Sequence, residues 1–417
     1  MDKQSESNKK RIIVICYGIG GASGLVFERL INQLNNYYDI DLFVSANNPN
    51  IQLNTQINVE VVRFIWYPKF LESFLRKHLI IDNTGYLQLN GLILKLIVKY
   101  FGNNPLYHIW TNRIYKRIKK RKQCYSLVFG LMDYNGFPPL IATKKMGEKL
   151  NLKTVVYSTD ANPVPEYWDS DRLYLKRAKK LLADYFPKLD SLYFSNDIMV
   201  KYEKELFNFG GKIRIGSLLT NSPVEKKNYT NTPSKLFLYT GSAWGPRSLK
   251  YLFSAFKRLL SVCPDAVLCF IGTREKGFTD SELSVFGEKE KKSIISYPRT
   301  NDKNFLDKFY AQACCYIDLN AIYEGDPFLS SKITNYILYN RPIICETGLH
   351  SAARLLFNNL ESVYLCDHSD DEIFDAMVDV LNKNNCYCYS ERESIIKKFS
   401  VETIANQLCC DLEALIN

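Results

Sequence analysis

Two polar loops in the second half of the sequence gather residues that could hold an anion. In YEGDPFLSSKITNYILYNRPII (323–344), Glu324 precedes Ser330, Ser331 and Lys332, which open a short predicted helix. Backbone N–H groups at a helix N-terminus favour an anion such as a phosphate. The two hydroxyls would add hydrogen-bond donors and the lysine a full charge. The alternative is that Ser330 only caps the helix and Lys332 points to water, and the sequence leaves both open.

The second loop is TGSAWGPRSLK (240–250), which again follows an apolar run and leads into a predicted helix. Gly241 and Ser242 would let a ligand approach the backbone closely. Arg247, expected in the first turn of the helix, could grip a diphosphate with its planar guanidinium. The alternative is an ordinary turn with a surface arginine. Both loops follow strands of one domain, so we expect them at the same edge of a sheet.

A third glycine-rich loop, GIGGASG (18–24), follows the first apolar run of the chain. Its third spacing is one residue longer than the G-x-G-x-x-G fingerprint, and no acidic residue follows the second strand closely, where the chain reads FVSANNPN. Both departures argue against a nicotinamide or flavin cofactor. Gly20 and Gly21 are expected to form a tight turn near a ligand, with a plain structural turn as the alternative.

The elements that would position these loops alternate between strands and helices. In the first half, RIIVICY (11–17), DLFVSA, SLVFGL (126–131) and TVVYSTD (154–160) read as strands, with helices after 24 and over about 137–150. In the second half, KLFLYTG, AVLCFIG, SIISYP, CCYIDL, PIICE and SVYLCD alternate with helices. Apolar runs separated by helices predict a parallel sheet that is covered on both faces.

We therefore expect an α/β protein with two Rossmann-like, doubly wound domains that face each other across a cleft. The predicted boundaries are an N-terminal domain over 1–222, a polar linker over 223–234, a C-terminal domain over 235–395 and a last helix within 396–417. That helix has Val401, Ile404, Leu408 and Leu412 on one face and could pack on either domain.

Composition excludes several other classes of protein. The 417 residues, 46% of them hydrophobic, are enough for two or three domains. MDKQSESNKK lacks the apolar core of a signal peptide. The twelve Cys form no C-x-x-C, and the four His are scattered, so neither a zinc site nor a disulfide framework is expected. We expect most Cys to be buried thiols in a reducing cytoplasm. The longest apolar stretch, 87–101, contains Lys95 and Lys99 and is shorter than the ~20 residues of a spanning helix.

These motifs together resemble the retaining glycosyltransferases with two Rossmann-like domains, specifically glycosyltransferase family 4. The resemblance covers mainly 235–385. Its glycine turn with a basic residue matches Gly241, Ser242 and Arg247, and its Glu loop with Ser-Lys and a helix ending at Pro matches Glu324, Ser331, Lys332 and Arg341-Pro342. The first half matches more loosely, through Gly20-Gly21 and the Asp160 loop.

The resemblance implies roles for these residues. Arg247 and Lys332 would hold the diphosphate of a nucleotide sugar, and Glu324 would contact the hydroxyls of the donor sugar. The resemblance also implies catalysis without a metal or another cofactor, because fixed cations can stabilise the leaving diphosphate. The remaining donor-binding residues that we expect are those that would flank the base and the phosphates: Gly20, Gly21, Thr273, Arg274, Tyr297, Pro298, Ser330 and Ser331.

Two positions depart from the family pattern. The place of a second Glu, seven residues before Pro342, is held by Asn335, whose amide can still hydrogen-bond a ribose hydroxyl. Many members have a His in the loop that here reads MDYNGF. Asp133 or Asp160 are the candidates to replace it, and we assign Asp160 a catalytic role beside Glu324.

The positive charge of the chain lies in its first half. The net charge is +10, and residues 61–122 hold 13 basic and 2 acidic side chains mixed with aromatic ones, ending in KRIKKRK (116–122). Such a segment is attracted to an anionic membrane surface, which would place the protein on the inner face of the plasma membrane. The alternative is a solvated basic helix over core aromatics. Nucleic-acid binding is not expected, because no nucleic-acid module appears.

The function that we expect is the transfer of a sugar from a nucleoside-diphosphate sugar to a hydroxyl of a glycan, with a lipid-linked acceptor in bacterial surface polysaccharide assembly. Two alternatives stay open: a sugar-nucleotide epimerase of the same fold, and a non-catalytic partner in glycan assembly. Incubating the protein with a donor alone distinguishes the epimerase, and nucleotide binding distinguishes the non-catalytic partner.

Overall fold

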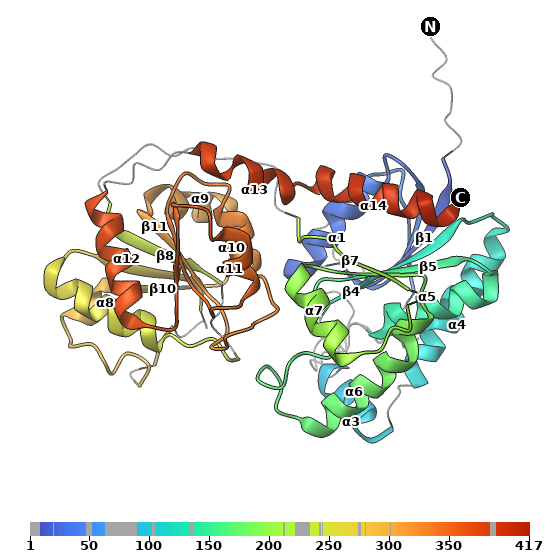
Figure 1. Ribbon diagram of the computed structural model, residues 1–417, viewed down its shortest axis with the longest axis horizontal. Helices are drawn as coiled ribbons and strands as arrows, with labels where there is room; N and C mark the ends of the chain where they lie inside the picture. Colours follow the sequence, from blue (N-terminus) through green and yellow to red (C-terminus); the bar gives the residue numbers. More distant parts are fainter. Residues whose placement is uncertain are drawn as a thin grey trace, which may run out of the picture. The chain divides into compact units, whose positions relative to one another are not determined.

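The computed structural model describes most of the chain as two compact units. The first contains residues 1–221 and 401–417, and the second contains residues 222–400. The residues described are 9–417 except for 20, 47–51, 63–89, 102–104, 134–136, 212, 222–233, 242, 244, 274–276, 280, 301 and 384–388. The predicted linker, 223–234, therefore lies almost entirely outside them. Each unit is built on its own parallel sheet (Figure 1).

The first unit contains a seven-stranded parallel sheet in the order β3-β2-β1-β4-β5-β6-β7. Its central strands are buried on both faces, and Ile12, Ile13, Val14 and Ile15 of β1 have no exposed surface. This is why they read as continuous apolar runs. The strands are β1 (Arg11–Gly18), β2 (Asp39–Ala46), β3 (Asn58–Val61), β4 (Leu127–Met132), β5 (Lys153–Ser158), β6 (Ser191–Phe194) and β7 (Arg214–Ser217).

Helices cover both faces of this sheet. The C-terminal helix α14 packs on α1, and its Ile404, Leu408 and Leu412 join the core of the first unit, so the last helix belongs to this unit. α5 packs on β4, β5 and β1, α4 packs on α5, and α3 packs on α6. These helices are α1 (Gly21–Leu34), α3 (Asn90–Phe101), α4 (Pro105–Arg121), α5 (Phe137–Leu150), α6 (Arg172–Tyr185), α7 (Asp197–Leu206) and α14 (Val401–Ile416).

The second unit contains a six-stranded parallel sheet in the order β10-β9-β8-β11-β12-β13. In both sheets the strand order reverses beside the first strand, between β1 and β4 and between β8 and β11. This is the doubly wound topology that the alternation of strands and helices predicted, and ligands of such sheets bind at the carboxyl ends near the reversal. The strands are β8 (Leu236–Thr240), β9 (Val267–Thr273), β10 (Ile294–Pro298), β11 (Cys315–Leu319), β12 (Ile343–Glu346) and β13 (Val363–Cys366).

The helices of the second unit also form two layers (Figure 1). α8 and α12 pack together on one face, where the predicted apolar stripe of α8, including Leu252 and Phe256, is buried. α9, α10 and α11 contact β8, β11, β12 and β13. The helices are α8 (Lys250–Val262), α9 (Lys303–Gln312), α10 (Ser331–Tyr336), α11 (Ala352–Phe357), α12 (Asp370–Asn382) and α13 (Glu393–Lys398).

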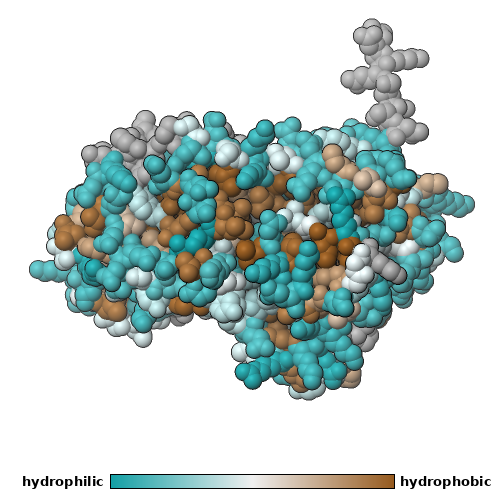
Figure 2. All heavy atoms as spheres, in the orientation of Figure 1, coloured by the Kyte–Doolittle hydropathy of each residue, from teal (hydrophilic) through white to brown (hydrophobic). Residues whose placement is uncertain are grey.

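Two expectations from composition can be compared with this structure. The ten cysteines that it describes are all free thiols, and eight of them are buried. No helix among the described residues is long and apolar enough to cross a membrane. On the face drawn in Figure 2, hydrophilic side chains cover much of the helices, with hydrophobic patches between them.

Candidate functional site

The two polar loops predicted to hold an anion meet at one edge of the second sheet. Gly241 follows β8, and Lys332 lies in the first turn of α10, which follows β11, the neighbour of β8. A Cβ atom built on Gly241 would lie 2.7 Å from Cε of Lys332, so the lysine stem crosses directly over this glycine. Gly241 has φ +109°, a conformation that side chains disfavour. Glycine adopts this conformation without strain and leaves the lysine stem in place.

A second glycine supports the first. Gly272, the penultimate residue of β9, has φ +118°, and a Cβ on it would lie 2.8 Å from Cα of Gly241. The two backbones therefore touch at the carboxyl ends of neighbouring strands. Because the backbone of Gly241 is packed against Gly272, a side chain added at Gly241 would have to displace the stem of Lys332.

Lys332 and Arg247 lie close enough to influence each other's charge. The pKa of Lys332 is lowered to about 8, first by burial and then by the positive charge of Arg247, with Asp318 acting in the opposite direction. Nζ of Lys332 lies 4.0 Å from Oδ1 of Asp318 and 5.3 Å from the ring centroid of Tyr239. Two cations at one strand edge repel each other, and an anion bound between them would remove that repulsion.

Arg247 occupies a different place from the one predicted. The sequence suggested the first turn of a helix, whereas α8 begins at Lys250 and Arg247 lies in the loop before it. Its side chain is half-buried. Burial raises the pKa of Tyr239, and the positive charge of Arg247 acts to lower it. The ring centroid of this tyrosine lies 5.3 Å from Nζ of Lys332.

Ser330 holds the first turn of α10. Its hydroxyl accepts a hydrogen bond from the backbone N–H of Lys332 at 3.2 Å and donates one to Oδ1 of Asp318 at 2.7 Å. Both Ser330 and Asp318 are buried. Because α10 contains six residues, its dipole is short, and the side-chain charge of Lys332 contributes more to anion binding. Ser331 and Asn335 lie at opposite ends of this helix and are half-buried.

Glu324 lies in the loop after β11 with an exposed side chain. Its Oε2 accepts a hydrogen bond from the backbone N–H of Leu349 at 3.1 Å, and its carbonyl accepts one from that of His350 at 2.7 Å. A Cβ on Gly348 would lie 2.2 Å from the carbonyl oxygen of Tyr323. The loop after β12 therefore clamps the Glu324 turn at the carboxyl edge of the sheet.

The residues predicted to flank a base are only partly described. Thr273 ends β9, but its side chain and Arg274 lie outside the described residues, as do Gly20 and Ser242. Gly21 is the first residue of α1. Tyr297 packs its ring on Phe305 and Phe309 of α9, with centroids 5.2 and 5.1 Å apart, and the following Pro298 is exposed.

The first unit brings two carboxylates together at its own sheet edge. Asp133 follows β4, and Asp160 follows the neighbouring β5. The pKa of Asp133 is raised to about 7, mainly by burial and further by the charge of Asp160. The Asp160 carbonyl accepts hydrogen bonds from Oγ of Ser158 at 2.7 Å and Nδ2 of Asn162 at 2.9 Å, which fixes its loop. A carboxyl group with a pKa near neutrality can exchange protons at ordinary pH.

Sequence reasoning missed two residues at the same edge of the second sheet, the buried Glu346 and the half-buried His368. Glu346 ends β12 and His368 follows β13, and their Oε1 and Nδ1 atoms lie 2.9 Å apart. The sequence does contain a signal that could have identified them. In each case an apolar run ends in charged or polar residues: PIICE ends in Glu346, and SVYLCD is followed by His368. Among the described residues, no group of three or more His, Cys, Asp or Glu is placed to hold a metal ion.

The substitution Gly241→Ala tests the contact between the two loops. We expect it to weaken nucleoside diphosphate binding at least tenfold, because the methyl group would displace Lys332 and disfavour φ +109°. The control is Gly210→Ala, where φ is +62° and no atom lies within 4 Å of the added Cβ. Isothermal titration should show a loss only for the first variant. If both variants bind the nucleoside diphosphate equally well, the position of Lys332 over Gly241 is not required for binding.

No protein-family model matches the chain, and no curated protein matches it in sequence. Solved structures do match it. The structure of Alr3699/HepE from Anabaena, in complex with UDP and glucose, has a TM-score of 0.63 at 12% identity and covers 97% of this chain and 99% of its own. A glycosyltransferase from Rickettsia africae has a TM-score of 0.62 at 11% identity, over 98% of this chain and 99% of its own.

The same fold also occurs in a putative UDP-N-acetylglucosamine 2-epimerase from Listeria monocytogenes, with a TM-score of 0.50 at 9% identity, over 97% of this chain and 96% of its own. Fold alone therefore does not separate transfer from epimerisation. The two parallel, doubly wound sheets and these full-length matches show that the chain has the two-domain α/β fold of the GT-B type.

Proposed function

We propose that the protein is a glycosyltransferase that moves a sugar from a nucleoside-diphosphate sugar to a hydroxyl of a glycan acceptor. The observation that carries this proposal is the stem of Lys332 lying over Gly241 at the carboxyl edge of the second sheet, with Arg247 near enough for its charge to lower the pKa of the lysine. The HepE complex adds a protein of this fold that binds UDP and glucose.

The proposed mechanism uses charge placed before the reaction begins. As the bond between the sugar and the diphosphate lengthens, negative charge grows on the departing phosphate oxygens. Fixed cations from Lys332 and Arg247 stabilise that charge more than they stabilise the intact donor, which lowers the barrier. In this proposal the two side chains supply the positive charge, so neither a metal nor another cofactor is required. We also propose that the transfer retains the anomeric configuration of the sugar.

We also propose roles for the other predicted site residues. Glu324 would accept hydrogen bonds from the hydroxyls of the donor sugar, with Oε2 held by the Leu349 backbone. Asp160 is proposed to act on the acceptor hydroxyl, and its charge contributes to raising the pKa of Asp133 to about 7. Asn335 and the loops at Thr273-Arg274 and Tyr297-Pro298 are proposed to bind the nucleoside, together with the Gly20-Gly21 turn, Ser242 and Ser331.

A thermal-shift screen with UDP, GDP and their sugars tests this function first. We expect one base to raise the melting temperature, with the diphosphate acting more strongly than the monophosphate. The absence of any shift would favour a non-catalytic partner. Conversion of the donor to an epimer without an acceptor would favour the epimerase.

We further propose that the acceptor is lipid-linked, that the protein acts in surface polysaccharide assembly and that the first unit rests on an anionic membrane. Most aromatic residues predicted for this surface lie in 63–89, outside the described residues. The described part places Leu96, Tyr100 and Phe101 of α3 at the surface, with 43%, 61% and 79% exposed. Lys116, Lys119, Lys120 and Lys122, in and just after α4, are also exposed.

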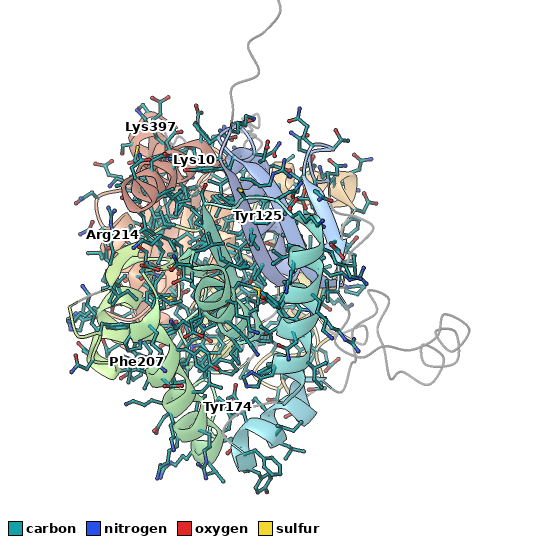
Figure 3. The ribbon with its side chains drawn as sticks, turned by 90° about the vertical axis from the view of Figure 1, so that its right-hand side faces the viewer. Lys10, Tyr125, Tyr174, Phe207, Arg214 and Lys397 are labelled. Carbon is teal, nitrogen blue, oxygen red and sulfur yellow. The ribbon has the colours of Figure 1, made fainter. Side chains whose placement is uncertain are left out.

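The polar side of α3 is occupied by contacts within the unit. Lys95 forms an ion pair with Asp169, Lys99 pairs with Asp171 at 3.0 Å, and Nζ of Lys95 lies 5.2 Å from the ring centroid of Tyr174 on α6. Figure 3 shows Tyr174 where α6 and α3 run side by side. These contacts fix α3 so that its apolar end stays outward.

The membrane proposal predicts that Tyr100→Ser/Phe101→Ser weakens binding to vesicles about tenfold or more, since each exposed aromatic ring would add roughly 1–2 kcal/mol on entering the interface. Co-sedimentation with phosphatidylcholine vesicles, with and without phosphatidylglycerol, measures this. Val262→Ser, which changes an apolar residue of α8 that is 64% exposed, is the control. If vesicle binding depends neither on these substitutions nor on phosphatidylglycerol, this surface does not bind the membrane and the proposal is wrong.

A further inference from the structure

A buried ion pair lies at the same sheet edge as the proposed donor site. Glu346, the last residue of β12, is 1% exposed, and the side chain of His368, two residues after β13, is 12% exposed. Nδ1 of His368 and Oε1 of Glu346 are 2.9 Å apart. Neither Oε2 of Glu346 nor Nε2 of His368 has a hydrogen-bond partner among the described residues. Buried polar atoms without a hydrogen-bond partner are uncommon in folded proteins.

The pair lies next to the proposed diphosphate site in the sheet, because Glu346 pairs with Leu319 of β11, the residue after Asp318, and Oδ1 of Asp318 lies 4.0 Å from Nζ of Lys332. The hydroxyl of Tyr239 experiences the charges of Arg247, Asp318 and Glu346, and the ring of the same tyrosine lies under Nζ of Lys332. A bare carboxylate at Glu346 would therefore act against the positive field of Arg247 and Lys332. Burial makes such an effect larger than it would be in water.

His368 is surrounded mainly by negative or aromatic groups. Glu346 faces it from β12, Glu324 from the loop after β11 and Asp367 from its own loop, where Asp367 pairs with Arg354 of α11. The ring of Tyr251 on α8 lies 6.4 Å away, centroid to centroid. Burial lowers the pKa of His368, but the hydrogen bond to Glu346 and the carboxylates outweigh it, so the pKa is raised above its ordinary value.

We propose that His368 is a positioning residue whose imidazolium cancels the charge of the buried Glu346 carboxylate, and that this proton sets how tightly Arg247 and Lys332 hold a nucleoside diphosphate. The inference rests on the function proposed above. Nδ1–H donates to Oε1 of Glu346 and keeps the ring beside the carboxylate. When the ring loses its proton, a net negative charge remains at the sheet edge that carries the proposed anion site, and diphosphate binding weakens.

A double-mutant cycle on the full-length protein separates charge from structure. His368→Asn keeps a hydrogen-bond donor near the Nδ1 position and removes the charge, and Glu346→Gln removes the opposing charge. We expect His368→Asn to weaken UDP or GDP binding about tenfold at pH 6, Glu346→Gln to have little effect or tighten it, and the double variant to return to within about threefold of the unchanged protein. His108→Asn, at a half-buried histidine of α4 in the first unit, is the control.

The pH dependence provides a second readout. In a Lys332→Arg background, which removes the titration of the lysine, diphosphate affinity should fall as the pH rises through the titration of His368. That decrease should disappear in the His368→Asn/Glu346→Gln double variant. Equal losses in the single and double variants, or a pH decrease that survives both changes, would overturn the charge role. If the unchanged protein binds no nucleoside diphosphate at all, the proposed function fails instead.

Discussion

Replacing Lys332 by Met should lower the rate of sugar transfer by about 10²–10³ and weaken nucleoside diphosphate binding by about 1.5–3 kcal/mol. Methionine keeps the length of the stem that crosses Gly241 and removes only the charge. The larger loss falls on the rate, because the charge of the leaving diphosphate is greatest in the transition state. Initial rates and isothermal titration measure the two effects. Unchanged kcat with intact donor affinity would remove Lys332 from the site.

The titration of Lys332 adds a pH dependence with a definite sign. Its pKa is lowered to about 8, so the charged form that binds an anion is present below that pH and is lost above it. Diphosphate affinity should therefore fall about tenfold for each unit of pH above about 8, until the pKa of the bound form is reached. Lys332→Arg should flatten this dependence, because arginine keeps its charge.

Replacing Glu324 by Gln should lower turnover by about 10²–10³ while the free nucleoside diphosphate binds as before. The amide oxygen can still accept from the backbone N–H of Leu349, so the loop should keep its shape. The lost carboxylate charge would affect only the donor sugar and the transition state. Turnover and titration with diphosphate and with nucleotide sugar are the measurements.

The control for this variant is Glu288→Gln, a carboxylate whose side chain is 89% exposed and which pairs with Lys291 outside the site. It should retain full activity and stability. Full activity in Glu324→Gln would show that this carboxylate has no part in transfer, and an equal loss of diphosphate binding would show that it supports the fold of the loop.

The fold was predictable from the sequence because parallel strands buried on both faces must be apolar throughout. β1 and β8 follow this rule closely, β11 departs from it at the buried Asp318, and each strand was placed within a residue or two. Short strands such as β3 and β7 were not identified, since four half-exposed residues show no pattern that differs from a loop. The side on which α14 packs depends on contacts with α1, which no local pattern encodes.

Part of the candidate site could be predicted, namely those residues whose type and position within a single loop suggested a binding role. Gly241 and Lys332 were each identified from residue type and position, and strand order then brought them into contact. Glu346 and His368 were missed because their pairing depends on β12 and β13 being neighbours. Arg247 was expected within a helix because the exact ends of a helix are hard to predict from sequence, and α8 begins only at Lys250.

The central claim is that Arg247 and Lys332 hold one pyrophosphate together. The most direct measurement is calorimetric titration of the nucleoside mono- and diphosphate into the unchanged protein, Arg247→Met, Lys332→Met and the double variant. We predict that the unchanged protein prefers the diphosphate, that each single variant loses most of this preference, and that the two losses are not additive. Losses that simply add, or a preference that survives in the double variant, would contradict the claim.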